Sequence, residues 1–252
     1  MKIQLIRHAT LLVSCGAKTI LVDPVLAPAG TRPPVDCTPH PRPNPLVDLP
    51  ATIDRKRLAQ VDAILLTHTH QDHFDPVAAA TLSKDIPVLC QPEDEDKVRQ
   101  AGFSSVEAVH TGRCWNGIDF FRTGGRHGHG LVGELMGPVS GYVIEAPGEP
   151  SLYLAGDTVW CPEVEGVLEA YRPRVVVVFA GAAQFVSGGP ITMDAADVGR
   201  VGRKAPAGTV VAVHLEAFNH CLLTRRDLTA YLEGEGLAGQ VLVPRDGDIL
   251  TF

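Results

Sequence analysis

Short apolar runs rich in Val, Ile and Leu recur along the whole chain and alternate with polar segments. Gly, Pro, Asp or Asn residues bound each run, which is the pattern typical of β-strands. Hairpin-like strands cluster early in the chain and again around Trp115–Ala155. The pattern predicts strands at Ile3–Ile6, Leu11–Val13, Thr19–Val22, Val61–Leu66, Val88–Cys90, Val106–Val109, Tyr142–Ile144, Leu152–Ala155, Val175–Phe179, Val210–Val213 and Gln240–Val243.

Signals for the start of a helix lie between several of these strands. Three of the expected helices follow an X-Pro pair, and the others follow a Thr or Asp residue that can cap a helix N-terminus. The expected helices are Val77–Ser83, Glu93–Ala101, Glu163–Tyr171, Ala195–Lys204 and Arg225–Glu233. Together with the strands, they predict a layered α/β protein in which helices cover mixed sheets.

The segment Pro24–Pro50 differs from the rest of the chain, because it carries nine of the 20 prolines and little periodicity. Its composition favours a rigid surface connection, although loops of this length in compact domains are often lids or binding loops. No internal repeat, low-complexity tract or linker divides the chain. We therefore expect a single domain over residues 1–252.

The composition excludes several classes of protein. Apolar residues make up 45% of the chain and charged residues 20%, as in ordinary globular proteins. The longest apolar stretch, Val175–Ala183, is far shorter than the roughly 20 residues of a membrane helix, so no membrane partner is expected. The N-terminus alternates like a strand rather than a secretory signal, and the six scattered cysteines form no C-x-x-C pair. Reduced thiols and a cytoplasmic location are therefore expected.

The densest group of ionisable residues directly follows the expected strand Val61–Leu66 and reads H-x-H-x-D-H. His68 and His70 are two residues apart in an extended segment, so their side chains point the same way and can bind one ion. Asp72 and His73 fall on the following turn, where they can reach a second ion. A buried strand that ends in such polarity needs partners or metal, because unpaired buried polar groups are costly.

This motif at a strand end resembles that of the metallo-β-lactamase-fold hydrolases. The resemblance covers most of the chain, because G-R-H-G-H-G at 125–130, A-G-D-T at 155–158 and V-H-L-E at 213–216 follow in the order and spacing of that family. It implies a four-layer αββα sandwich of the metallo-β-lactamase type. It also implies a site for two ions, in which His68, His70 and His127 hold one, Asp72, His73 and His214 hold the other, and Asp157 bridges them.

Two ligand positions have alternatives in the sequence. His129 shares the glycine-rich turn of His127, and the sequence does not say which of the two points inward. The similar lactonase-like branch carries its ligand early in this turn, which favours His127. His220 follows His214 closely, and it is a candidate catalytic residue or an alternative ligand; a purely structural role is as plausible.

Two further motifs resemble the N-terminal hairpin of the branch that includes ascorbate-6-phosphate lactonase. They are Arg7-His8-Ala9-Thr10 and Val22-Asp23-Pro24. In that branch the first-strand histidine lies near the metal site, which makes His8 a candidate substrate-binding residue. Trp160, three residues after Asp157, is a second candidate to wall the pocket, although a core tryptophan fits as well.

The implied ligands are nitrogen and oxygen only, which suits Zn²⁺ or Mn²⁺, with Fe²⁺ as a further option. The family's β-lactamases proper use a cysteine at the second ion, and its flavodiiron proteins replace the second histidine by glutamate. Asp157 and His70 stand at these positions here. The resemblance therefore favours lactonases, thioesterases and phosphodiesterases.

The implied reaction is hydrolysis by a metal-bridged hydroxide, since two cations lower the pKa of bound water towards about 7. Asp72 would orient the hydroxide, and His220 would bind the oxyanion or protonate the leaving group. We expect a lactone or other ester of a small polar substrate. The alternatives are a metal-dependent phosphodiesterase or nuclease, and a non-catalytic metal-binding regulatory protein.

The formal charge of −7 is unfavourable for binding the phosphate backbone of a nucleic acid, so no nucleic-acid partner is expected. A small-molecule substrate is the expected partner. The proline-rich segment leaves a homo-oligomer open as well, because it can serve an interface as easily as a lid.

Overall fold

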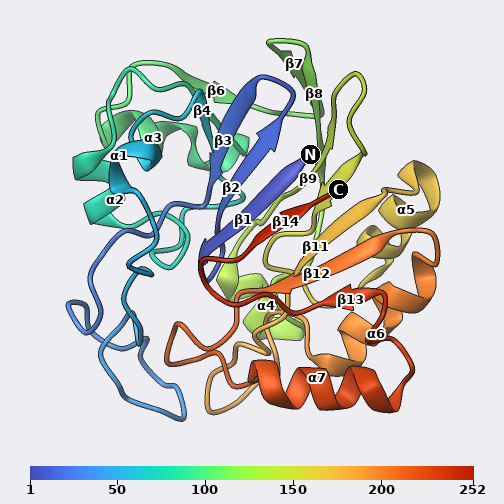
Figure 1. Cartoon of the computed structure of the whole chain (residues 1–252). Helices are drawn as coiled ribbons and strands as arrows, with labels where there is room; N and C mark the ends of the chain where they lie inside the picture. The colour runs from blue at the N-terminus through green and yellow to red at the C-terminus, as the bar shows by residue number, and fades with distance from the viewer.

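The computed structural model describes the backbone of residues 1–252 and every side chain except that of Arg55. Two mixed sheets of seven strands each form the centre of the molecule (Figure 1). The first has the order β14-β1-β2-β3-β4-β5-β6, with β1 (Lys2–Arg7), β2 (Thr10–Cys15), β3 (Lys18–Val22), β4 (Ala63–Leu65), β5 (Val88–Cys90), β6 (Val106–Ala108) and β14 (Ile249–Thr251). The second has the order β13-β12-β11-β10-β9-β8-β7, with β7 (Gly112–Trp115), β8 (Ile118–Thr123), β9 (Gly141–Glu145), β10 (Leu152–Leu154), β11 (Val175–Phe179), β12 (Thr209–Val213) and β13 (Val241–Leu242).

Helices cover the outer face of each sheet. The outer face of the first sheet packs on α1 (Arg55–Leu58), α2 (Pro76–Thr81) and α3 (Glu95–Gln100), the last preceded by the 3₁₀ turn η1 (Pro92–Asp94). The outer face of the second packs on α5 (Pro162–Tyr171), α6 (Ala195–Lys204) and α7 (Arg225–Gly234). The remaining helix, α4 (Gly130–Met136), lies at one end of the sheets (Figure 1). This is the four-layer αββα sandwich that the sequence predicted.

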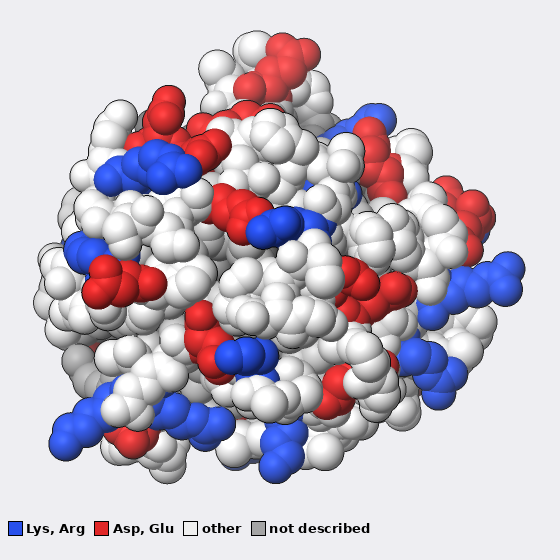
Figure 2. All heavy atoms as spheres, turned by 90° about the horizontal axis from the view of Figure 1, so that it is seen from above, with Lys and Arg blue, Asp and Glu red and all other residues white. Residues whose placement is uncertain are grey.

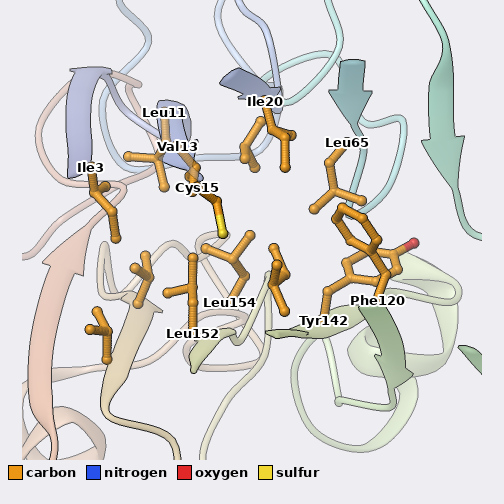
Figure 3. Packing of buried hydrophobic residues seen from close by; sticks show 14 of the residues in the cluster. Ile3, Leu11, Val13, Cys15, Ile20, Leu65, Phe120, Tyr142, Leu152 and Leu154 are labelled. Atoms are coloured by element: carbon orange, nitrogen blue, oxygen red, sulfur yellow. The ribbon is translucent and has the colours of Figure 1, made fainter. Parts of the chain in front are cut away.

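The inner faces of the two sheets share one apolar layer. Figure 3 shows side chains of the two sheets pointing toward one another, including Ile3 and Leu11 from the first and Leu152 and Leu154 from the second. Every residue of strand β11 is buried. Because alternate residues of a strand point to opposite sides, β11 is buried on both faces. Its apolar run is therefore continuous, as expected for a central parallel strand between two layers.

Every strand and helix expected from the sequence is present, with ends that differ by a few residues. The sequence did not delimit β7, β8 and β14, nor the helices α1 and α4. β7 and β14 are largely exposed edge strands, so no apolar run marks them. Helix α4 is flanked by glycines and buries no residue completely, so it carries no strong apolar pattern either.

The proline-rich segment 24–50 is held against the body of the protein at its base. The guanidinium of Arg7 donates hydrogen bonds to the carbonyl oxygens of Ala27 at 3.0 Å and Val47 at 2.9 Å. The carboxylate of Asp75, which caps α2, also accepts from the backbone N–H of Ala27 at 2.8 Å. These buried contacts place the segment beside the ends of β1 and β4 rather than leaving it as a free connection.

The surface and the helices agree with the composition. On the face shown in Figure 2, basic and acidic side chains are interspersed rather than gathered by sign. Among the residues that the structure describes, no helix combines the length and the apolar character needed to cross a bilayer.

Candidate metal centre

The expected ligands come from separate parts of the chain and meet at one end of the sheets. Parallel strands end at the same edge of a sheet, so residues that follow them are brought together. His68 and His70 follow β4, Asp72 and His73 lie in the turn before α2, His127 lies in the turn before α4, Asp157 follows β10 and His214 follows β12.

The first group of candidate ligands consists of His68, His70 and His127. One nitrogen of each ring lies within 4.8 Å of the others. The closest pair is Nε2 of His68 and Nδ1 of His70, which are 2.9 Å apart. The rings of His68 and His127 are buried, so these nitrogens face one another away from bulk water.

The second group consists of His8, Asp72, His73 and His214, with their ligand atoms within 4.8 Å of one another. Nε2 of His214 lies 3.2 Å from Nε2 of His73. Oδ2 of Asp72 lies 3.7 Å from the first of these nitrogens and 3.8 Å from the second. Apart from His8, this is the set that the sequence assigned to the second ion.

Asp157 lies between the two groups. Its Oδ2 is 3.4 Å from Nε2 of His127 and 3.2 Å from Nε2 of His73. Its Oδ1 is 3.4 Å from Nε2 of His214, and this buried oxygen has no hydrogen-bond partner among the described residues. The carboxylate therefore has the position required of a bridging ligand.

Hydrogen bonds on the outer side of the rings leave nitrogen lone pairs facing the centre. Nδ1 of His127 lies 2.8 Å from the carbonyl oxygen of Ile191, which can only accept, so this nitrogen carries the proton. Nδ1 of His73 lies 2.8 Å from Oδ2 of Asp23 and donates in the same way. Once such a ring is neutral, its Nε2 is unprotonated and can bind a cation, which displaces any proton held there. Converging imidazole nitrogens and carboxylate oxygens fit divalent cations such as Zn²⁺ or Mn²⁺.

The electrostatics of the cluster also suit a cation. Burial lowers the pKa of His68 and of His214 well below the usual histidine range, so both rings are neutral, as metal ligands must be. Burial acts to raise the pKa of Asp157, but His214 and His73 outweigh it and hold that pKa well below its usual range. Burial also lowers the pKa of His73, but Asp157 and Asp72 reverse this and raise it well above the ordinary value. The centre thus stabilises positive charge.

Asp23 is part of this arrangement and was given no role from the sequence. It follows β3, whose parallel neighbour β4 leads into the histidine motif. Its Oδ2 accepts from His73 and from the hydroxyl of Thr67 at 2.7 Å, and its Oδ1 accepts from the Thr67 backbone at 2.8 Å. The sequence signal that could have indicated this role is an acidic residue at the end of β3, the strand beside β4. Carboxylates behind a ligating histidine fix its tautomer and orientation.

We expect Asp23→Asn to weaken metal binding by roughly 10- to 100-fold, the usual cost of losing such a partner. The amide can place only one acceptor oxygen among three donors, so His73 loses its charged partner. Competition with a chromogenic chelator measures the affinity. Asp62→Asn is the matched control, because Asp62 also binds a backbone N–H but lies outside the site. Equal affinities in the two variants would contradict the role of Asp23.

The structure brings His220 close to Asp72, on the side of the cavity. Nε2 of His220 lies 3.3 Å from Oδ2 of Asp72, and both residues line the cavity. The expected catalytic pair is therefore adjacent. His214, rather than His220, lies among the candidate ligands of the second ion.

His8, the first candidate substrate-binding residue, lies against Asp72 and is not among the described residues that line the cavity. Its ring is completely buried and packs against that of His214, with centroids 3.6 Å apart and the ring planes tilted by 37°. Its Nε2 lies 3.4 Å from Oδ2 of Asp72. Burial lowers the pKa of His8 to about 4 despite the carboxylate, so the neutral ring supports Asp72 from behind.

Trp160 and His129 lie away from the cluster. Trp160 is half-buried and packs against the apolar layer between the second sheet and its helices, and it is absent from the described lining of the cavity. Trp160 thus follows Asp157 along the chain but lies on the side of the helices. His129 is exposed at the N-terminus of α4, whereas His127 points inward.

A cavity of about 370 Å³ opens over the cluster. Five of the polar residues already described form its base: His70, Asp72, His127, Asp157 and His220. Apolar side chains also line it, namely Met136, Phe185, Ile191 and Phe218, and the rest of the lining comes from Asn44, Gln71 and residues 32–36 of the proline-rich segment. The arrangement can hold a small ligand with an apolar body and an electrophilic end at the base.

Comparison with known proteins agrees with this geometry. Residues 18–215 match the Beta-lactamase superfamily domain. The UPF0173 protein YddR of Bacillus subtilis is 40% identical over 100% of both chains. A UPF0173 metal-dependent hydrolase of Azorhizobium caulinodans is 30% identical and covers 75% of this chain and 80% of its own.

A solved structure also matches the whole chain. The isothiocyanate hydrolase from Delia radicum gut bacteria is 34% identical, with a TM-score of 0.94 over 100% of this chain and 99% of that chain.

Proposed function

Since this chain belongs to the β-lactamase superfamily and to its UPF0173 metal-dependent hydrolases, we propose that it hydrolyses small isothiocyanates, R–N=C=S, with an apolar R group. The chain is a metal-dependent hydrolase, and the choice of substrate is the proposal. The observation that carries it is the cavity, whose lining combines apolar side chains with histidines and carboxylates. The similarity to an isothiocyanate hydrolase supports the same choice.

The chemistry of an isothiocyanate suits both parts of the cavity. The group is neutral and linear, and its central carbon is electrophilic. The R group can lie against Phe185, Ile191 and Phe218, where its burial is favourable. The N=C=S end then reaches the polar base, beside Asp72 and Asp157.

The proposed reaction consumes one water and balances as R–N=C=S + H₂O → R–NH₂ + O=C=S. The water oxygen bonds to the central carbon, and one proton goes to nitrogen, which gives a thiocarbamate. A second proton on nitrogen lets the C–N bond break, with the electron pair leaving on the amine. When bound, two divalent cations supply a water of lowered pKa and polarise the group under attack.

The chain's own residues supply the proton transfers. Asp72 borders the cavity and can accept the proton of the attacking water through Oδ2. His220 lies 3.3 Å from that oxygen and faces the cavity, so it can pass a proton to the substrate nitrogen. His8 holds Asp72 from the buried side at 3.4 Å. Asp72 and His220 are thus the proposed catalytic pair.

The alternatives from the sequence remain as tests of this proposal. A lactone or other ester would use the same base, and the resemblance of the N-terminal motifs to the ascorbate-6-phosphate lactonase branch is its support. The apolar side chains favour a substrate with an apolar body, although the lining also contains Arg32, with which a phosphorylated lactone could pair. A phosphodiester carries a negative charge at its reacting centre, which suits the apolar side chains less than a neutral group does, and a purely regulatory role leaves the Asp72–His220 pair unused.

We expect kcat/KM for alkyl and aralkyl isothiocyanates to exceed that for simple lactones, 4-nitrophenyl acetate and bis-p-nitrophenyl phosphate by at least ~10-fold, because a matched pocket discriminates to this degree. Release of amine and carbonyl sulfide measures the reaction. The metal-loaded protein is compared with its His68→Ala variant and with buffer alone, since isothiocyanates also react without enzyme. A higher kcat/KM for a lactone or for the phosphodiester would overturn the proposal.

A further inference from the structure

The middle of the proline-rich segment lines the cavity although its own side chains are not buried in the protein. No residue from Thr31 to Pro43 is buried. A loop of this kind has little apolar contact to hold it in place, so polar contacts must determine its position. The wall residues Pro33–Asp36 lie in the middle of this exposed stretch.

One side chain makes four of the hydrogen bonds that hold this stretch, beside those of Arg32 with Gln71 and of the Val186 backbone with Cys37. Nδ2 of Asn219 donates to the carbonyl oxygens of Val35 at 3.2 Å and His40 at 2.8 Å, and to Oγ1 of Thr38 at 2.6 Å. Oδ1 of Asn219 accepts from the backbone N–H of Val35 at 3.0 Å and from Nδ2 of Asn44 at 2.7 Å. The same side chain thus binds both limbs of the loop.

Asn44 completes the contact from the loop side. Its Oδ1 accepts from the backbone N–H of Asn219 at 2.9 Å, and its backbone pairs with that of Arg32. Both asparagines are buried, at 2% exposure for Asn44 and 1% for Asn219. Hydrogen bonds between buried amides are costly to leave unmade, so the two side chains act as a clamp.

Asn219, one of the two residues of the clamp, directly precedes His220 of the proposed catalytic pair. Asn219 stands between Phe218 and His220, which both line the cavity. The carbonyl oxygen of His220 accepts a hydrogen bond from the backbone N–H of Gln184, which also holds residues 218–220 in place. The wall at Val35 and the imidazole of His220 are therefore connected through a single residue.

We propose that Asn219 is a positioning residue that fixes the Pro33–Asp36 wall relative to His220 and thereby determines which R groups the cavity accepts. The choice of R groups as the readout rests on the proposed function. The position of the wall does not, because the hydrogen bonds of Val35 with Asn219 are present without any substrate.

The test compares Asn219→Ala with Gln240→Ala. Gln240 is a matched control, because its side-chain amide also donates to three backbone carbonyls, those of Gly202, Ala205 and Gly208, at the end of α6 and just beyond it. None of these residues lines the cavity. Both variants are expected to melt at a lower temperature. Asn219→Ala alone is expected to reduce discrimination between methyl and 2-phenylethyl isothiocyanate, by about 10-fold in the ratio of kcat/KM values, mainly through KM.

Hydrogen exchange of the metal-loaded proteins tests the clamp without any substrate. Asn219→Ala is expected to speed exchange in residues 30–46, including the Val35 amide, while metal content stays unchanged. Asn44→Ala is expected to reproduce the effect, and the double variant to add little, because the two side chains act as one unit. Asn219→Gln, which restores an amide, is expected to recover part of the protection.

The outcomes separate the clamp from the proposed function. Unchanged exchange in residues 30–46 of Asn219→Ala would overturn the clamp, whatever the substrate. Faster exchange with unchanged discrimination, or equal loss of discrimination in Gln240→Ala, would overturn its part in selectivity. If the unaltered protein turns over esters but no isothiocyanate, the proposed function fails, and a matched pair of short and long esters then tests the same wall.

Discussion

Asp157→Ala is expected to release metal from both ion positions and to lower hydrolysis by about 10³-fold or more. The carboxylate lies within 3.4 Å of His73, His127 and His214. His127 belongs to the first ligand group, and the other two belong to the second. Losing several kcal/mol of metal-derived stabilisation corresponds to this factor, because each 1.36 kcal/mol is about tenfold in rate. Elemental analysis of protein expressed with ample metal measures the first effect, and turnover measures the second.

Asp157→Asn and Asp197→Ala complete this experiment. The asparagine keeps the size of the side chain but removes its charge, so it separates loss of the ligand from a cavity in the fold. Asp197 is also buried, but it binds the Trp160 backbone and Arg200, outside the described ligand groups. We expect Asp197→Ala to lower the melting temperature and leave the metal content unchanged. Full metal content in Asp157→Ala would refute a bridging role.

His127→Ala is expected to lose metal and activity to a degree that His129→Ala does not approach. The two residues share one turn, but His127 is buried in the first ligand group and His129 is exposed. With one of three nitrogen donors removed, the first ion loses a ligand and its charge stabilisation, so we expect a fall in kcat/KM of roughly 10²-fold or more. His129→Ala is expected to stay within about threefold of the unaltered protein, since surface substitutions away from special features change little.

The comparison is sharp because both variants change the same residue type in the same turn. Metal content by elemental analysis and kcat/KM are measured on the same preparations. Added Zn²⁺ or Mn²⁺ is expected to restore part of the activity of His127→Ala, because mass action offsets a weaker site. A greater loss in His129→Ala than in His127→Ala would show that the turn presents the other histidine to the ion.

Much of the fold was predictable because its signals are local. Strand β11 reads as a continuous apolar run since it packs on both faces, and α6 begins at a capping aspartate and ends near Lys204 as expected. The elements that were missed have no such signal. β7 exposes most of its residues, and α4 buries none of its residues completely. Local pattern reports burial, and these elements have little of it.

The candidate ligands were also largely predictable, but their surroundings were not. The H-x-H-x-D-H motif and the later histidines follow strands, and residues that follow parallel strands meet at one edge of a sheet. The sequence could not distinguish His127 from His129, because both belong to one glycine-rich turn and are only two residues apart. It placed His8 near the metal site but could not show that the ring is completely buried behind Asp72.

The sequence by itself determined the alternation of strands and helices, the kinds of ligand and their order along the chain. Only the tertiary structure decided which side chains meet: Asp23 with His73, 50 residues away, and Asn44 with Asn219, 175 residues away. The physical reason is that periodicity and capping depend on neighbours within a few residues. A hydrogen bond between distant residues depends instead on how the two sheets bring the loops at their ends together.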